Sequence, residues 1–246
     1  VIFILTLGIA ANTSIFSIVR HTLFNPLASP ESERLMVIEN AYLSMDGTPS
    51  VASPILDWGK FLQSFESLSA YRISDGGLNL SFGTGSFEPE RIEGIGVSAG
   101  FFSTFKVAPV LGRAFIPEEE ETGRNRVLVL NHSFWQKRFG ADGEIVGKTV
   151  LLNEVPYVVI GVASPGFRFP LKADVWIPIT YGKDRIFTDM TGIHKVVGRL
   201  RPGISAEQAQ QELDAIRQRF SEENPGSWLA TKELRITPLL DNVIGD

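Results

Sequence analysis

Cysteine is absent from the 246-residue sequence. Its absence excludes disulfide bonds, thiol nucleophiles, iron–sulfur clusters and most structural zinc sites. The three histidines, His21, His132 and His194, lie far apart and lack the short spacing of metal ligands. We therefore expect no metal site, and the cellular compartment has to be inferred from other features.

Motifs that bind phosphate or activate a nucleophile are also absent. The sequence holds no G-x-x-x-x-G-K-[ST] loop that could cradle ATP and no G-x-S-x-G elbow. Gly94-Ile95-Gly96 lacks the third glycine of a dinucleotide fingerprint. The acidic run Glu118–Glu121 is predicted to be an exposed loop, because adjacent carboxylates cannot converge on one reacting atom. The chain is therefore predicted to be no enzyme, with no catalytic or cofactor-binding residues.

An excess of positive charge is lacking as well, since the formal net charge is −5. A nucleic acid would require concentrated lysine and arginine to neutralise its phosphates, so we expect no nucleic-acid partner. Hydrophobic residues make up 43% of the sequence and charged residues 21%, a balance typical of folded domains.

The first nineteen residues carry no charged side chain, and the run ends at Arg20. As a helix it would be roughly 28 Å long, close to the hydrocarbon thickness of a bilayer. We predict part of a transmembrane helix at residues 1–22 and a linker at residues 23–34. A signal peptide and a buried core helix are the alternatives, although the run lacks a clear cleavage site and a charged face.

The remaining sequence predicts short strands separated by turns, with a few helices. The predicted strands are residues 35–38, 78–82, 91–97, 127–130, 149–152, 157–162, 175–179, 195–200 and 233–237. The predicted helices are residues 133–139, residues 206–220, a short turn within 98–105, and a helix that starts at Ser53-Pro54 and buries Trp58, Phe61, Leu62, Phe65 and Leu68.

Two details give these helices their orientation. Ser205 and Gln208 form a capping box, and the helix after them has a buried stripe of Ala209, Leu213, Ile216 and Phe220. The turn within 98–105 carries three phenylalanines, Phe101, Phe102 and Phe105, for which core packing is the favoured role over ligand stacking.

Several runs resemble the MacB/FtsX-type permeases of ABC transporters, and among these the duplicated permeases of acidobacteria. Residues 8–19 with Leu23-Phe24-Asn25-Pro26-Leu27 resemble the end of that family's first transmembrane helix. Further runs resemble the extracytoplasmic core of that family: residues 134–140, residues 145–148, Val159-Ile160-Gly161-Val162, Pro165-Gly166-Phe167 and residues 198–203. The resemblance covers nearly the whole chain.

This resemblance implies an α+β extracytoplasmic domain in two parts. A porter-like part of βαβ units would comprise residues 35–107 and 191–246, and a sabre-like part, residues 108–190, would be inserted between them. The helix-bearing ends and strand-rich middle of the sequence agree with that division. The domain would stand on the periplasmic side of the bacterial inner membrane, between two transmembrane helices, so the backbone near Ala28 and near Leu240 is expected within about 25 Å on one side.

The function that the resemblance implies is transmission of ATP-driven motion across the membrane, for efflux or for handling of lipoproteins and peptides. The partners would be a cytoplasmic ATPase subunit or domain, a second permease in a homodimer or pseudo-dimer, and a periplasmic adaptor protein. Two other hypotheses remain open: a membrane-anchored binding or scaffold module without transport, and an extracytoplasmic hydrolase.

Overall fold

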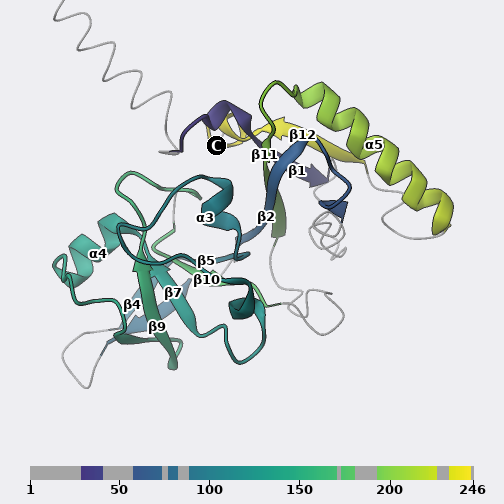
Figure 1. Cartoon of the computed structure of the whole chain (residues 1–246). Helices are drawn as coiled ribbons and strands as arrows, with labels where there is room; N and C mark the ends of the chain where they lie inside the picture. Colours follow the sequence, from purple (N-terminus) through teal and green to yellow (C-terminus); the bar gives the residue numbers. More distant parts are fainter. Residues whose placement is uncertain are drawn as a thin grey trace, which may run out of the picture.

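The computed structural model describes residues 29–40, 58–73, 77–82, 89–170, 173–180, 193–225 and 233–244. Within these ranges the fold is a mixed α+β structure built on one large, strongly curved sheet (Figure 1). The predicted transmembrane helix at residues 1–22 lies outside the described ranges. In the described part of the chain, no helix is both long and apolar enough to span a bilayer.

Twelve strands form the sheet in the described ranges. They are β1 (Leu35–Asn40), β2 (Phe65–Ile73), β3 (Leu78–Ser81), β4 (Glu90–Ile92), β5 (Gly94–Val97), β6 (Leu111–Gly112), β7 (Val127–Leu130), β8 (Thr149–Leu152), β9 (Val155–Val162), β10 (Val175–Pro178), β11 (Ile193–Leu200) and β12 (Leu234–Pro238). Their spatial order is β12-β1-β11-β2-β5-β10-β7-β9-β8-β3-β4, with β6 paired to β9. The predicted strands are confirmed with bounds shifted by a few residues, except that residues 91–97 form two strands, β4 and β5.

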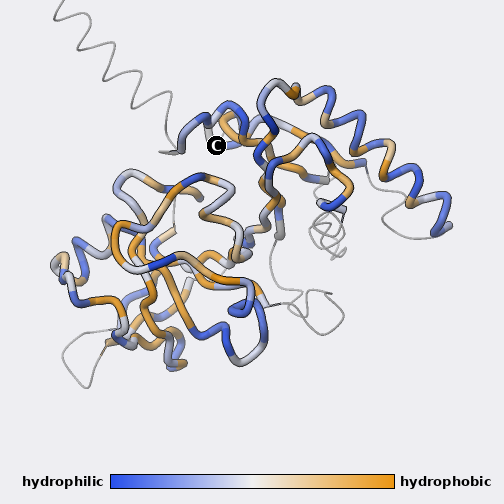
Figure 2. The backbone as a smooth tube through the Cα atoms, in the orientation of Figure 1, coloured by the Kyte–Doolittle hydropathy of each residue, from blue (hydrophilic) through white to orange (hydrophobic). Residues whose placement is uncertain are grey.

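One end of the sheet is a split βαβ unit. Strands β11 and β12 both pair antiparallel with β1, which lies between them, and α5 (Ala206–Glu223) connects the two. The capping box at Ser205 and Gln208 is formed as predicted. Ala209 and Leu213 are buried against the sheet, and Ile216 and Phe220 pack at the margin of the same cluster, while the rest of α5 is mostly hydrophilic (Figure 2).

The other end of the sheet is built around the parallel pair β7 and β9, which α4 (His132–Phe139) and the β8 hairpin connect. Asn131 caps α4 by accepting hydrogen bonds from the backbone N–H groups of Ser133 and Phe134. Strands β3 and β4 extend this end of the sheet beyond β8.

The two faces of the sheet bury different clusters, because side chains alternate along each strand. Val37 faces a central, phenylalanine-rich cluster, whereas its neighbour Ile38 packs beneath α5. The three phenylalanines of the turn that contains α3 (Phe101–Thr104) are fully buried in the central cluster. They contact Phe167, Phe169 and Trp176, which confirms their predicted core role.

The predicted helix over Trp58 to Leu68 is wrong in its second half. Its start lies outside the described residues, the chain turns at 58–62, and Phe65 to Ile73 form strand β2. Strand β2 pairs with β11 over most of its length and with β5 on its other side, so tertiary pairing overrides the helical spacing.

The predicted strand at residues 91–97 is interrupted at Glu93. There the backbone turns away to pair with Asp174: the Glu93 N–H donates to the Asp174 carboxylate, and the Glu93 carbonyl accepts from the Asp174 and Val175 N–H groups. Burial raises the pKa of Asp174 above the ordinary range of a carboxyl group.

Candidate functional site: a polar joint at the entry of the chain

The residues singled out at the sequence level do not assemble into a catalytic centre. Within the described ranges, no group of histidine and acidic side chains could hold a metal ion. His132 packs edge-on against Trp135, and the side chains of His21 and His194 are not among those that the structure describes.

The prediction that the whole acidic run Glu118–Glu121 is exposed is wrong at Glu119. This side chain is buried in a 3₁₀ turn, where it accepts from Arg113 at 2.6 Å and from the Ile116 N–H at 3.0 Å. The ion pair and the backbone bond compensate its burial, so the role of Glu119 is structural.

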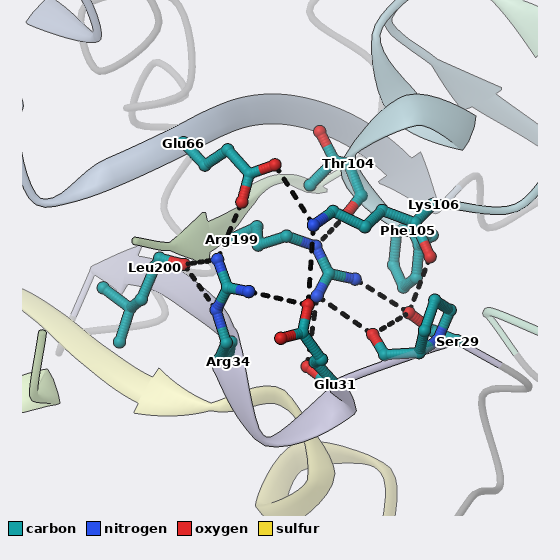
Figure 3. A network of polar contacts seen from close by, with 10 residues as sticks. Ser29, Glu31, Arg34, Glu66, Thr104, Phe105, Lys106, Arg199 and Leu200 are labelled. Atoms are coloured by element: carbon teal, nitrogen blue, oxygen red, sulfur yellow. Dashed lines mark hydrogen bonds and ion pairs between the residues drawn. The ribbon is translucent and has the colours of Figure 1, made fainter. Parts of the chain in front are cut away.

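The most unusual polar group in the described structure is Arg199, whose side chain is fully buried in β11. Its guanidinium donates hydrogen bonds to three backbone carbonyls: Nε to Thr104 at 2.8 Å, and Nη1 to Pro30 at 3.0 Å and to Glu31 at 3.1 Å. Nη2 donates to the Ser29 hydroxyl at 2.9 Å (Figure 3). One side chain thus links β11, the end of α3 and residues 29–31.

We call residues 29–34 the entry segment, because they lead into β1. Ser29 reinforces its attachment by donating to the Phe105 carbonyl at 2.6 Å. The buried part of the contact, made by Arg199, Ser29, Thr104 and Phe105, is referred to as the inner layer.

Burial of the Arg199 cation is costly, and it lowers the pKa of this group below that of a free guanidinium. An arginine nevertheless stays charged in a protein, so its N–H groups must be satisfied by acceptors. Four neutral oxygens serve this purpose: the carbonyls of Thr104, Pro30 and Glu31 and the hydroxyl of Ser29. No carboxylate of the described residues is hydrogen-bonded to Arg199, so the stability of the buried cation depends on where the backbone places the carbonyls around it.

An outer layer of charged side chains surrounds the inner one. Arg34 bridges Glu31 and Glu66 at 2.7 Å each, and Lys106 lies 3.5 Å from Glu31 and 3.2 Å from Glu66 (Figure 3). The hydrogen bond from Arg34 holds the pKa of Glu31 below its usual range, and the one from Lys106 does the same for Glu66. Arg34 also donates to the Leu200 carbonyl of β11 at 2.8 Å. We call both layers together the polar joint.

The backbone at the polar joint is itself unusual. Glu31 and Lys106 adopt left-handed conformations, with φ of 50° and 53°, although neither is glycine. Such residues cost on the order of 1 kcal/mol or more, and they persist where surrounding contacts hold them in place. Here both flank the carbonyls and hydroxyl that Arg199 and Ser29 use.

The other end of the described chain lies beside the entry segment. The 3₁₀ turn η1 (Ser32–Arg34) contacts α6 (Leu239–Ile244), and Leu239 is fully buried in the central cluster. Figure 1 shows α6, in yellow, beside the purple turn η1. Ala28 itself lies outside the described residues, but the element that follows it meets the helix that contains Leu240.

Sequence reasoning did not find the polar joint, although one signal was available. Val197 and Arg199 are two residues apart in a predicted strand and therefore share a face. Val197 is fully buried, so a cation in phase with it is an anomaly of the kind that marks a buried polar contact.

The family is decided by a match along most of the chain. The family model described as the MacB-like periplasmic core domain matches residues 1–216. The chain belongs to this family. It is a member of the MacB/FtsX type of permease domain, as the sequence motifs predicted.

Curated relatives match this MacB-like domain over a shorter stretch. The macrolide export ATP-binding/permease protein MacB of Salmonella paratyphi A is 27% identical over 124 residues, and that of Burkholderia thailandensis is 29% identical over 124 residues. Each match covers 49% of this chain, which spans about a fifth of the relatives' length.

Solved structures share the fold at low identity. The periplasmic region of MacB from Actinobacillus actinomycetemcomitans aligns with a TM-score of 0.61 and 19% identity, and covers 87% of this chain and 92% of its own. The extracellular domain of the transporter YknZ from Gram-positive bacteria aligns with a TM-score of 0.56 and 17% identity, and covers 82% and 99%. These likenesses establish the MacB-like periplasmic fold.

Proposed function

We propose that this domain is the extracytoplasmic part of an ABC-transporter permease and transmits ATP-driven motion across the membrane, for efflux or for lipoprotein or peptide handling. The observation that carries the proposal is the contact between the entry segment and α6, the last described helix. The turn η1 contacts α6, and α6 packs against β1 and β12 at one end of the sheet. A domain inserted between two membrane helices requires this arrangement.

The position of the charged groups supports a link to the membrane. Residues 29–34 are joined to β11, β2 and the end of α3 by the polar joint, so displacement of whatever precedes Ser29 acts on the folded domain at several points. The predicted membrane helix at residues 1–22 would supply that displacement. The folded part would lie on the periplasmic side of the inner membrane.

The proposal includes the partners implied by the resemblance: a cytoplasmic ATPase subunit or domain, a second permease copy, and a periplasmic adaptor. It also includes the two-part division into residues 35–107 with 191–246 and residues 108–190. Under this division, strands of the two parts would pair with each other in two places, β3 with β8 and β5 with β10.

The experiment compares transport with the alternative of a membrane-anchored scaffold. The full permease is reconstituted with its ATPase in lipid nanodiscs, and a spin label is placed on both copies at Gln136, an exposed residue of α4. A transport function predicts that ATP changes the distance between the two labels, measured by pulsed electron resonance. A distance that is identical with and without ATP favours the scaffold. A hydrolysis-deficient ATPase is the control.

A further inference from the structure

We infer that Arg199 is the positioning residue through which movement of the entry segment reaches the sheet, and that the outer layer of the polar joint is dispensable for this step. The inference rests on the proposed function. It assigns different roles to two neighbouring sets of polar contacts that differ in burial.

The geometry of the guanidinium makes Arg199 suited to this role. Its planar fork fixes its acceptors in defined directions, and these acceptors belong to the entry segment and to the end of α3. A lysine at the same place would offer a point charge on a flexible stem and could not hold all four oxygens in that geometry. Displacement of residues 29–31 therefore moves α3 and β11 together.

Two routes lead from Arg199 into the domain. Strand β11 lies between β1 and β2, and backbone hydrogen bonds join it to both. The end of α3 leads to Phe101, Phe102 and Phe105, which pack in the same central cluster as Trp176 of β10 and Val129 of β7. Because packed interiors resist compression, movement at Arg199 is carried toward both ends of the sheet.

The outer layer has the opposite character. The side chains of Glu31, Glu66 and Lys106 are 49%, 38% and 37% exposed, and that of Arg34, which pairs with both glutamates, is 13% exposed. Ion pairs of this exposure are screened by salt and contribute little each. The ion pairs of the outer layer orient the exposed side chains of the entry segment. The buried hydrogen bonds of Arg199 fix the backbone of this segment to β11 and α3.

The test uses the full permease with its ATPase in nanodiscs and the variants Arg199→Met and Arg199→Lys. The first readout is the distance distribution between spin labels at Glu33 and Gln136 of one chain, two exposed positions on either side of the joint. The second is the ATP-dependent change in distance between Gln136 labels on the two copies.

We expect both Arg199 variants to broaden the first distribution and to reduce the ATP-dependent change by more than half. Glu66→Gln, in the outer layer, should leave both readouts close to those of the unaltered protein. Leu152→Ala is the control for instability, because Leu152 is buried in β8 far along the sheet and its truncation creates a cavity without touching the joint. It should lower the melting temperature and keep the ATP-dependent change.

The outcomes separate the inference from the proposed function. If the unaltered protein shows no ATP-dependent change, the proposed function fails. If it shows the change and both Arg199 variants retain it with a narrow Glu33–Gln136 distribution, the role of Arg199 is refuted. Should Arg199→Met not fold, Ser29→Ala replaces it, because it removes one acceptor of Arg199 and leaves the cation in place. A narrow distribution and an unchanged ATP response in Ser29→Ala and Arg199→Lys would equally overturn the inference.

Discussion

Gly161 of β9 provides a sharp test of how the sheet is packed, because β6 pairs antiparallel with β9 and places Gly112 opposite Gly161. A Cβ atom built on Gly161 would stand 2.5 Å from the Arg113 carbonyl oxygen, 3.1 Å from that of Leu111 and 3.2 Å from the Arg113 nitrogen. All three atoms belong to the backbone and cannot rotate away as a side chain would. Gly161→Ala must therefore push residues 111–113 outward.

The magnitude follows from the contacts that flank the glycine. Overpacking costs about 1–3 kcal/mol. The displacement also weakens two backbone hydrogen bonds, Val110 N–H to Val162 O at 2.8 Å and Arg113 N–H to Ile160 O at 3.0 Å, each contributing about 1 kcal/mol. Replacing glycine also reduces the conformational entropy of the unfolded chain, which offsets the loss of stability by about 0.4–1 kcal/mol. We expect a net loss of roughly 3 kcal/mol, or a melting temperature lower by about 6–12 °C.

The assay is thermal unfolding of the 246-residue chain in detergent, followed by circular dichroism. The matched control is Gly143→Ala: this exposed glycine has no heavy atom within 4 Å of the added Cβ and no positive φ. Its replacement should be neutral or slightly stabilising. Equal melting temperatures for Gly161→Ala and Gly143→Ala would refute the close packing of β6 on β9.

Three further predictions concern the joint and α4. Arg34 and Lys106 lower the pKa values of Glu31 and Glu66. The ion pairs of the outer layer should therefore stabilise the folded state above the ordinary carboxyl pKa of about 4.3, and this stabilisation should be lost as the pH falls below that value. The unfolding temperature, measured from pH 6 to pH 3, should fall over this range, and it should fall less in the Glu66→Gln variant. Asn131→Ala should cost about 1 kcal/mol through loss of the α4 cap, as measured by urea unfolding. Arg199→Met should cost about 1–3 kcal/mol in the same assay, since it leaves the buried Thr104 carbonyl without its hydrogen-bond donor.

Much of the local structure could be predicted because it is encoded by nearby residues. The capping box of Ser205 and Gln208 and the apolar stripe behind it define α5 without reference to the rest of the chain. Strands β7, β8 and β9 are short apolar runs between turn residues, and Gly140 ends α4 in the left-handed conformation that glycine favours. Family motifs coincide with these elements.

Contacts between distant segments could not be predicted in this way. The spacing of Phe65 and Leu68 is that of a helix, and pairing with β11 and β5 makes this segment a strand. The polar joint brings together residues 29–34, 66, 104–106 and 199–200, and most of its acceptors are backbone carbonyls, which have no sequence signature. The burial of Glu119 is a local effect instead: Arg113 and the Ile116 N–H, both within six residues, donate to its carboxylate.

The most direct measurement is the ATP-dependent distance between Gln136 labels on the two copies of the reconstituted permease. We predict that ATP shifts this distance, that a hydrolysis-deficient ATPase prevents repeated cycling, and that Arg199→Lys diminishes the shift while Leu152→Ala preserves it. A distance that stays the same with and without ATP in the unaltered protein would contradict a role for this domain in transmitting motion across the membrane.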